Sequence, residues 1–184
     1  MENLLAKWSY EIKENNKLIK RQKPKLSKSF VVGFGKLLYL FMSSQTVSMQ
    51  DTSNTTRSVN AYFSSIAINA GVGTTTYGIQ VGSSSSAESI NDYALGTKIV
   101  HGTSAGQIQY GANTTGSPTA TSTTASFRIT RVFTNTSGGN VTIEEIGLAF
   151  SSSYYFLIIR DITGTITLTN GQAITINYDL TTTI

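Results

Sequence analysis

Two adjacent carboxylates, Glu144 and Glu145, are the residues in this 184-residue sequence whose types most directly suggest chemistry. Two carboxyl groups on one face of a site can act as general acid and general base. Neighbouring side chains of a regular strand point to opposite faces, however, so these two groups could cooperate only on a bulged strand. Nothing in the sequence supplies the cleft or the partner residue that such a pair needs. We therefore interpret the pair as structural.

The apolar residues around this pair change their phase. They fall on odd positions before the glutamates and on even positions after them: Val141, Ile143, Ile146, Leu148 and Phe150. A bulge at the glutamates would bring both sets onto one face of a strand. We predict a hairpin that turns at residues 137–140 and has a second strand that bulges at 144–145.

The patterns for a nucleophile or a phosphate loop are incomplete. GTSAG, residues 102–106, matches the G-x-S-x-G nucleophile elbow, but that motif needs a helix after the serine and a histidine later in the chain. Here the strand-like GQIQYG follows Ser104, and the single histidine, His101, precedes it. GVGTTTYG, residues 71–78, lacks the Lys-Ser/Thr ending of a phosphate loop.

Metal and thiol chemistry are not indicated either. The absence of cysteine excludes disulfides, thiol catalysis and cysteine-ligated metals. The aspartates show no recognised ligand spacing, since they are scattered as Asp51, Asp92, Asp161 and Asp179. We predict a protein that is not an enzyme and has neither a metal nor a cofactor.

The charge is placed unevenly along the chain. Charged residues make up 13%, about half the usual share of a soluble domain. Residues 1–50 hold nine Lys or Arg against three Glu, whereas residues 51–184 hold five basic and seven acidic residues. The candidate contact residues are Lys13, Lys17, Lys20, Arg21, Lys23, Lys25 and Lys28. Three interpretations stay open for them: a solvated face, contacts with acidic patches on neighbouring subunits, or contacts with phosphates of packaged nucleic acid.

Residues 1–44 are predicted to form a basic N-terminal arm. Trp8, Tyr10 and Ile12 alternate with polar residues and precede a turn at 14–17, which predicts a short β-hairpin. An amphipathic helix follows, capped by Ser27 or Ser29. Its apolar residues recur at helical spacing and are assigned to assembly: Phe30, Phe34, Leu37, Leu38 and Phe41.

The apolar stretch of this helix is not expected to span a membrane or to act as an export signal. It runs only from residue 30 to residue 42 and contains Lys36, so it is too short and too charged to span a bilayer. No small-x-small cleavage site follows it, so we expect no export signal.

Residues 45–184 are predicted to form an all-β domain, a β-sandwich of jelly-roll type. Seven or more short apolar segments are separated by turn residues at regular spacing and without helical stretches. The last two, GTITLTN and AITINYDL, are predicted to pair as a hairpin with a loop at 170–172. This register sets Leu168 opposite Ile174 and buries one face.

Several phrases carry a family likeness. LSKSFVVGFGKLLYLF, TVSMQDTSNTTRSV, GIQVGSSSSAESINDYALGTKIVHG, GQIQYG and FTNTSGGNVTIEEIGLAF, with IIRD and TNGQAITINYDL, resemble a group of virion structural proteins of tailed bacteriophages and related viruses. The resemblance implies a β-sandwich module that works by assembling and has no enzymatic role. It supplies no functional residues that could be carried over to this chain.

The leading functional expectation is a virion structural protein that self-assembles into, or decorates, a capsid or tail. Its partners would be copies of itself and other virion proteins, and it would be made in the host cytoplasm and reside in the virion. The alternative is a carbohydrate- or receptor-binding module of a tail fibre or surface adhesin. That module would use aromatic residues in exposed loops: Tyr77, Tyr93, Tyr110 and Tyr154.

Overall fold

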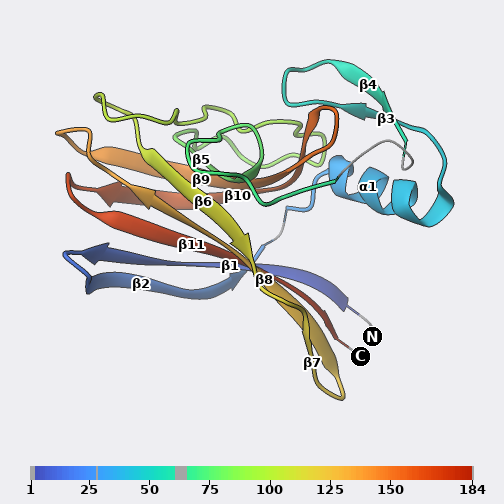
Figure 1. Ribbon diagram of the computed structural model, residues 1–184, viewed down its shortest axis with the longest axis horizontal. Helices are drawn as coiled ribbons and strands as arrows, with labels where there is room; N and C mark the ends of the chain where they lie inside the picture. The colour runs from blue at the N-terminus through green and yellow to red at the C-terminus, as the bar shows by residue number, and fades with distance from the viewer. Residues whose placement is uncertain (1–2, 28, 61–65, 184) are drawn as a thin grey trace.

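A computed structural model describes residues 3–27, 29–60 and 66–183, and antiparallel strands dominate it (Figure 1). The predicted all-β class is confirmed. The elements are β1 (Asn3–Glu14), β2 (Lys17–Leu26), α1 (Val32–Ser43), β3 (Val47–Gln50), β4 (Thr56–Val59), β5 (Gly78–Gly82), β6 (Gln109–Thr115), β7 (Thr119–Ala120), β8 (Thr124–Thr134), β9 (Val141–Ser151), β10 (Tyr155–Leu168) and β11 (Ala173–Thr183).

Two main sheets share one hydrophobic core. The larger sheet has the strand order β2-β1-β11-β8-β6, with β7 paired to β8, and the smaller has the order β10-β9-β5. Phe133 and Tyr178 of the larger sheet belong to the same buried cluster as Leu148 and Phe156 of the smaller one. Figure 1 shows the two sheets as layers, with α1 and the β3–β4 pair at one end. The fold is sandwich-like.

The N-terminal hairpin is confirmed, and its first strand is part of the core. Asn15 and Asn16 have φ values of 49° and 64°, the left-handed conformation that a two-residue hairpin turn requires. β1 also pairs with β11 from Asn3 to Lys13. Trp8, Tyr10 and Ile12 alternate inward and are at most 4% exposed. Residues 1–44 and 45–184 therefore share one core, although they were predicted as an arm and a domain.

Two predicted hairpins are wrong. β8 and β9 lie in different sheets, and so do β10 and β11. The turns at 137–140 and 169–172 therefore carry the chain from one sheet to the other, and the predicted pairing of Leu168 with Ile174 does not form. Both residues are nevertheless fully buried. Alternation of apolar residues requires a common core but does not distinguish a hairpin from two strands that face each other across it.

The two crossings are tied together by Asn135, whose side chain is fully buried. Its amide nitrogen donates hydrogen bonds of 2.8 Å to the carbonyls of Gly139 and Leu168, one in each crossing. Its backbone N–H donates to the carbonyl of Gln172, and its own carbonyl accepts from Gly171. One side chain thus satisfies backbone groups of both turns.

α1 begins later than predicted and without a serine cap. Val31 is the N-cap residue and no side chain caps the helix. The segment before it runs beside β10, where Phe30 bridges Ile159, so Ser27 and Ser29 cannot cap α1. Gly33 lets the helix approach that strand closely, because a Cβ atom there would lie 2.2 Å from the carbonyl oxygen of Leu157.

The irregularity predicted at the glutamate pair is present, but the extra residues belong to the partner strand. Ile162 of β10 pairs with Glu145 of β9, and the next pair is Ile166 with Ile143. Three residues of β10 thus lie opposite Glu144 alone. Val141, Ile143, Ile146, Leu148 and Phe150 all belong to the same core cluster, so the phase change is resolved as predicted.

Candidate functional site

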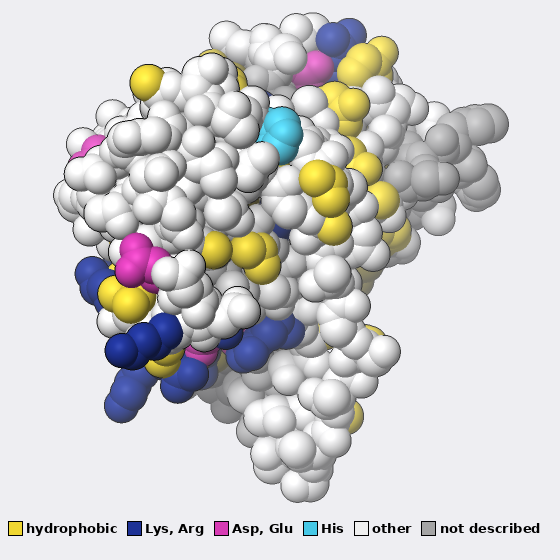
Figure 2. Space-filling model, turned by 60° about the vertical axis from the view of Figure 1, so that its left-hand side comes forward, with side chains coloured by type: hydrophobic (Ala, Val, Ile, Leu, Met, Phe, Trp, Pro, Cys, Tyr) yellow, Lys and Arg dark blue, Asp and Glu magenta, His cyan; other side chains and the backbone are white. Residues whose placement is uncertain are grey.

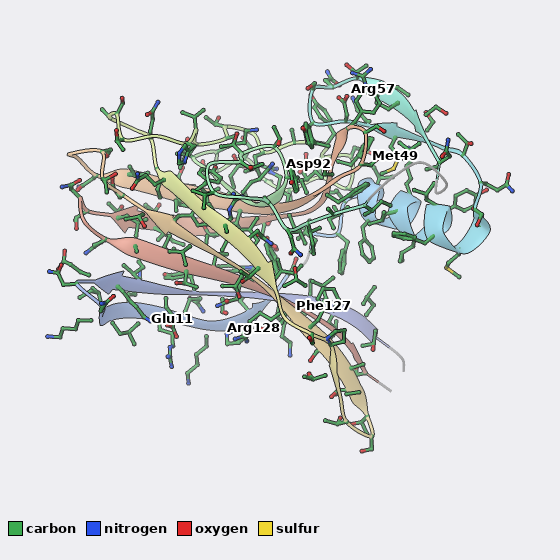
Figure 3. All side chains as sticks on the ribbon, in the orientation of Figure 1. Glu11, Met49, Arg57, Asp92, Phe127 and Arg128 are labelled. Carbon is green, nitrogen blue, oxygen red and sulfur yellow. The ribbon has the colours of Figure 1, made fainter. Side chains whose placement is uncertain are left out.

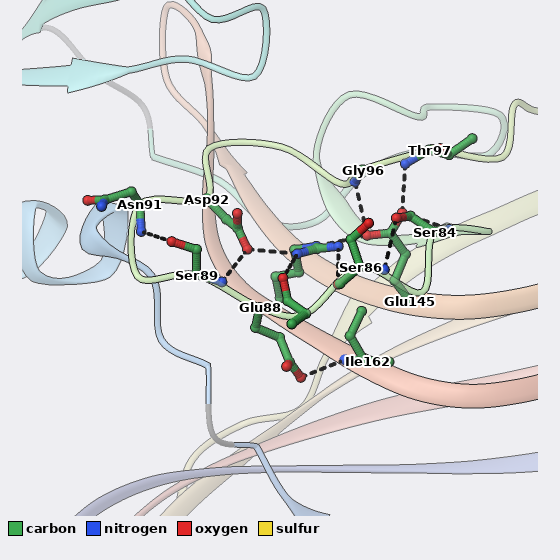
Figure 4. A network of polar contacts seen from close by, with 12 residues as sticks. Ser84, Ser86, Glu88, Ser89, Asn91, Asp92, Gly96, Thr97, Glu145 and Ile162 are labelled. Carbon is green, nitrogen blue, oxygen red and sulfur yellow. Dashed lines mark hydrogen bonds and ion pairs between the residues drawn. The ribbon is translucent and has the colours of Figure 1, made fainter.

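Glu145 is fully buried and forms the centre of an ionic network on the face of the smaller sheet away from the core (Figure 4). Its carboxylate accepts hydrogen bonds from the backbone N–H groups of Gly96, Thr97 and Ser84, at 3.0, 2.8 and 3.3 Å. It also accepts from Nε of Arg160 at 2.8 Å. The carboxylate therefore binds the long segment 83–98 to the sheet.

Arg160 extends this network from β10. One terminal nitrogen contacts Asp92 at 2.8 Å and the carbonyl of Ala87, and the other donates to the carbonyl of Ser86. Burial by itself lowers the pKa of the guanidinium, but the ion pairs with Asp92 and Glu145 raise it above its ordinary value. Both carboxylates pair with the one guanidinium of Arg160, and Glu145 is closed off from solvent, so the network holds a segment in place.

Arg131 is a second buried cation, and its hydrogen bonds go to backbone carbonyls. Nε donates to Gly111, and the two terminal nitrogens donate to Tyr77, Ile79, Gly71 and Thr74, at distances from 2.7 to 3.3 Å. The guanidinium also lies 4.9 Å from the ring centroid of Tyr110. Burial lowers the pKa of Arg131 to about 10. This side chain fixes the loop before β5 against β6.

Asp161 and Tyr178 form a third buried contact between the two sheets. The Asp161 carboxylate accepts hydrogen bonds from the hydroxyls of Tyr178 at 3.0 Å and Ser27 at 2.9 Å. Burial, together with the charge and hydrogen bond of Asp161, raises the pKa of Tyr178 well above its ordinary value. Burial also raises the pKa of Tyr110.

We expect stability to fall as the pH rises above about 10, the unperturbed tyrosine pKa. The unfolded chain then releases phenolic protons that the buried Tyr178 and Tyr110 retain, so the folded state binds more protons. Arg131 and Lys98 oppose the trend, because burial lowers both pKa values and the folded state loses those protons first. The comparison with a variant that lacks the Tyr178 hydroxyl therefore isolates the tyrosine contribution. Urea midpoints measured from pH 8 to 11 should decline less in Tyr178→Phe than in the unmodified protein. Tyr39→Phe, whose ring is half exposed, is the control; equal declines in all three proteins would contradict the assignment.

The basic candidate residues gather on the β1–β2 hairpin. Six of the seven are exposed: Lys13, Lys17, Lys20, Arg21, Lys23 and Lys25. Lys28 lies outside the described residues. Figure 2 shows dark blue Lys and Arg side chains concentrated in one region of the surface.

The five apolar residues assigned to assembly divide between the core and the surface. Leu37 is buried, and Phe30 and Phe34 are partly buried against the core. Leu38 and Phe41 are exposed at 41% and 57%. Tyr39 and Met42 join them on the outer side of α1, at 51% and 86%. Sequence periodicity gave the helix but could not separate its two faces.

The aromatic candidates do not form one surface. Tyr110 is buried and donates to the carbonyls of Ile99 and Val81. Tyr77 stacks on Tyr155, with ring centroids 5.9 Å apart. Tyr154 is 38% exposed and lies under Arg57, whose guanidinium carbon is 4.0 Å from its ring centroid. Tyr93 is partly buried and lines a separate hollow beside α1.

The nucleophile-elbow pattern lies in an irregular loop. No helix follows Ser104, and His101 accepts a hydrogen bond at Nδ1 from the backbone N–H of Tyr110. Among the described residues, no three His, Asp or Glu side chains converge as metal ligands do. Across residues 3–27, 29–60 and 66–183, no helix is long and apolar enough to cross a membrane.

Sequence patterns did not reveal four buried polar centres: Glu145 with Arg160, Arg131, Asp161 with Tyr178, and Asn135. A signal existed for Arg131, because it alternates with Ile129 and Phe133 and so falls on the inward face of its strand. Comparison with known proteins gives no further guidance: no family model matches this chain, and no curated protein or solved structure shows significant similarity to it.

Proposed function

We propose that this chain is a structural protein of a virus particle of the tailed-bacteriophage type, which acts by assembling with copies of itself and with other virion proteins. The resemblance of its turn-and-strand phrases to virion proteins supports the proposal. The observation that carries it is the uncovered apolar surface of α1, made of Leu38, Tyr39, Phe41 and Met42. Clusters of exposed apolar side chains on a folded protein mark sites of interaction.

This surface continues into an apolar groove. The groove, of about 370 Å³, lies between α1 and the ends of β1, β8 and β11 and is lined by Leu4, Phe34, Leu38, Phe127 and Leu180, among others. Phe127 is labelled on β8 in Figure 3. From Leu37 to Thr46 the sequence has no charged residue. A second copy of the same surface is therefore a compatible occupant, because no like charges would meet there.

We expect the double variant Phe41→Asp/Met42→Asp to abolish self-association without unfolding the monomer. Both side chains are more than half exposed, so the carboxylates stay solvated until a partner covers them and incur the cost of burying charge only in the assembly. Sedimentation velocity over a range of protein concentrations should show oligomers for the unmodified chain and monomers for the variant.

Val72→Asp is the control, since Val72 is 75% exposed and lies in the loop before β5, not on α1. Oligomers that persist in the double variant would show that another surface assembles the protein. An unmodified chain that stays monomeric and binds glycans in a Tyr154- and Tyr155-dependent manner would support the alternative, a carbohydrate- or receptor-binding module. Removing residues 1–44 is not an equivalent test, because it removes β1 from the core.

A further inference from the structure

We propose that the open edge of the larger sheet, formed by β2, is a docking surface for a double-stranded nucleic acid held through its phosphates. This inference names a partner that the proposed assembly does not require. Its cations lie mainly on the β1–β2 hairpin, away from the apolar surface of α1, so it is tested with other variants than the proposed self-association.

The cations are dense on this edge and little neutralised. Five of the ten residues of β2 are Lys or Arg, none is acidic, and all five are exposed. Lys7 and Lys13 of β1 are exposed beside them. Within the described residues, Glu11 is the single acid in ion-pair contact with this group, at 2.6 Å from Arg21 and 3.8 Å from Lys13. The edge therefore presents a strong positive field.

The same edge is unsuited to another strand. Its pairing with β1 shifts register twice, between Trp8 and Tyr10 and between Ile12 and Lys13. Pro24 has no N–H to donate to a neighbouring strand. Bulges, proline and lysine are the features that keep sheet edges from pairing. What the edge can still bind is a partner that needs charge and not backbone hydrogen bonds.

The cations lie on both faces of the edge. On one face, the ammonium nitrogen of Lys20 lies 6.0 Å from the ring centroid of Tyr10. That of Lys25 lies 5.6 Å from the ring centroid of Trp8. On the other face, a hollow of about 340 Å³ is lined by Arg21, Lys23 and Arg128 together with Glu11 and Asn177. Figure 3 labels Glu11 and Arg128 on this side. A phosphate backbone following the edge would meet cations along its whole length.

A second copy of this chain does not offer the complementary charge. Of the nine acidic residues that the structure describes, Glu88 alone is exposed, and its carboxylate accepts the backbone N–H of Ile162. The others are buried or partly buried, and five of them are held in ion pairs: Glu11, Asp51, Asp92, Glu145 and Asp179. The polyanion must therefore come from outside the assembly of like chains.

Two observations favour a duplex over a single strand. The aromatic rings of the hairpin, Trp8 and Tyr10, are 2% and 4% exposed, so they cannot stack on the unpaired bases that single-strand binding proteins use. β2 has ten residues, a length of roughly 33 Å at the rise of an extended strand. This is close to the roughly 34 Å of one turn of a duplex.

The test uses the full-length chain and a fluorescent DNA duplex of random sequence, with binding followed by anisotropy between 50 and 200 mM salt. We expect the triple variant Lys17→Gln/Lys23→Gln/Lys25→Gln to bind at least about tenfold more weakly at low salt. The slope of log affinity against log salt should become shallower by about 2.7, because each lost phosphate contact removes about 0.9. A single strand of the same length should bind more weakly than the duplex.

The control is Ser85→Glu/Thr103→Glu/Ala105→Glu, which lowers the net charge equally at exposed loop positions outside the hairpin. It should retain most of the affinity and the full slope. Equal losses of DNA affinity in both variants would mean that only the net charge of the protein matters, and would overturn the proposal. An affinity that does not depend on salt would also overturn it. Tighter binding to phosphatidylserine vesicles or to polyglutamate than to the duplex would also overturn it, because the partner would then be a membrane or an acidic protein.

Discussion

Replacing Glu145 by glutamine is expected to lower the free energy of unfolding by about 3–5 kcal/mol, the usual cost of removing one partner of a buried ion pair. Arg160 is 3% exposed and would keep only Asp92 as a charged partner. The new amide group would place N–H donors against the N–H of Gly96 or Thr97, which the carboxylate now accepts. Urea unfolding at pH 7 measures the loss.

Glu144→Gln is the matched control, one residue away on the same strand. Glu144 is only partly buried and accepts one hydrogen bond, from the hydroxyl of Thr165, so its replacement should change stability by less than about 0.5 kcal/mol. Hydrogen exchange should also become faster at the amides of Gly96 and Thr97 in the Glu145 variant alone. Similar stability losses in both variants, or unchanged exchange at these amides, would show that the carboxylate does not hold segment 83–98.

Replacing Arg131 by methionine is expected to cost at least about 3 kcal/mol, because five carbonyl oxygens lose a guanidinium donor and each buried group left unpaired costs about 1–3 kcal/mol. The carbonyl of Gly71 keeps the N–H of Thr74 as a donor. Removal of a buried charge offsets part of the sum, so the loss stays below the total of the five. Arg131→Lys should recover little, since one ammonium group has three donors and cannot span carbonyls from both sides of the planar fork.

Arg128→Gln, three residues earlier on the same strand, separates this effect from the loss of any arginine in β8. Arg128 is exposed and forms a surface ion pair with Asp179 at 2.7 Å, so its replacement should cost less than about 1 kcal/mol. Thermal and urea unfolding of both variants give the comparison. An Arg131→Met protein as stable as Arg128→Gln would mean that the loop at 71–79 does not depend on the guanidinium.

Sequence patterns predicted the strands well because alternation is a local property. FRITRVF, VTIEEIGLAF and the apolar run in SYYFLIIRDI all form the expected strands, and the last is buried on both faces as its continuous apolarity implies. The phase change at Glu144 and Glu145 also gave a correct position for irregular pairing. It did not reveal which strand carries the extra residues, because that depends on the partner in β10.

The unpredicted features depend on segments that have no period. Segment 83–98 is rich in serine and its apolar residues do not alternate. No pattern in it predicts that Glu145 accepts hydrogen bonds from three of its backbone N–H groups. The turn after β10 contains Asn170-Gly171, which is typical of a hairpin, yet it crosses between sheets. Its course is set by the buried amide of Asn135, more than thirty residues away in the sequence. The residues of a turn alone do not predict a course that depends on so distant a contact.

The pairing of β1 with β11 has a consequence for the order in which the protein can fold. Lys13 pairs with Ala173 and Asn3 with Thr183, so during synthesis β1 must wait for residues about 160 to 180 positions later before its second edge is covered. Until then Trp8, Tyr10 and Ile12 lack most of their core, and an apolar hairpin face of this kind can aggregate. During that delay the lysines and Pro24 of β2 disfavour pairing of the other edge with a second chain, as charged residues beside apolar strands do. The same cations that would hold a phosphate backbone in the finished protein thus keep the nascent hairpin from pairing with the wrong chain.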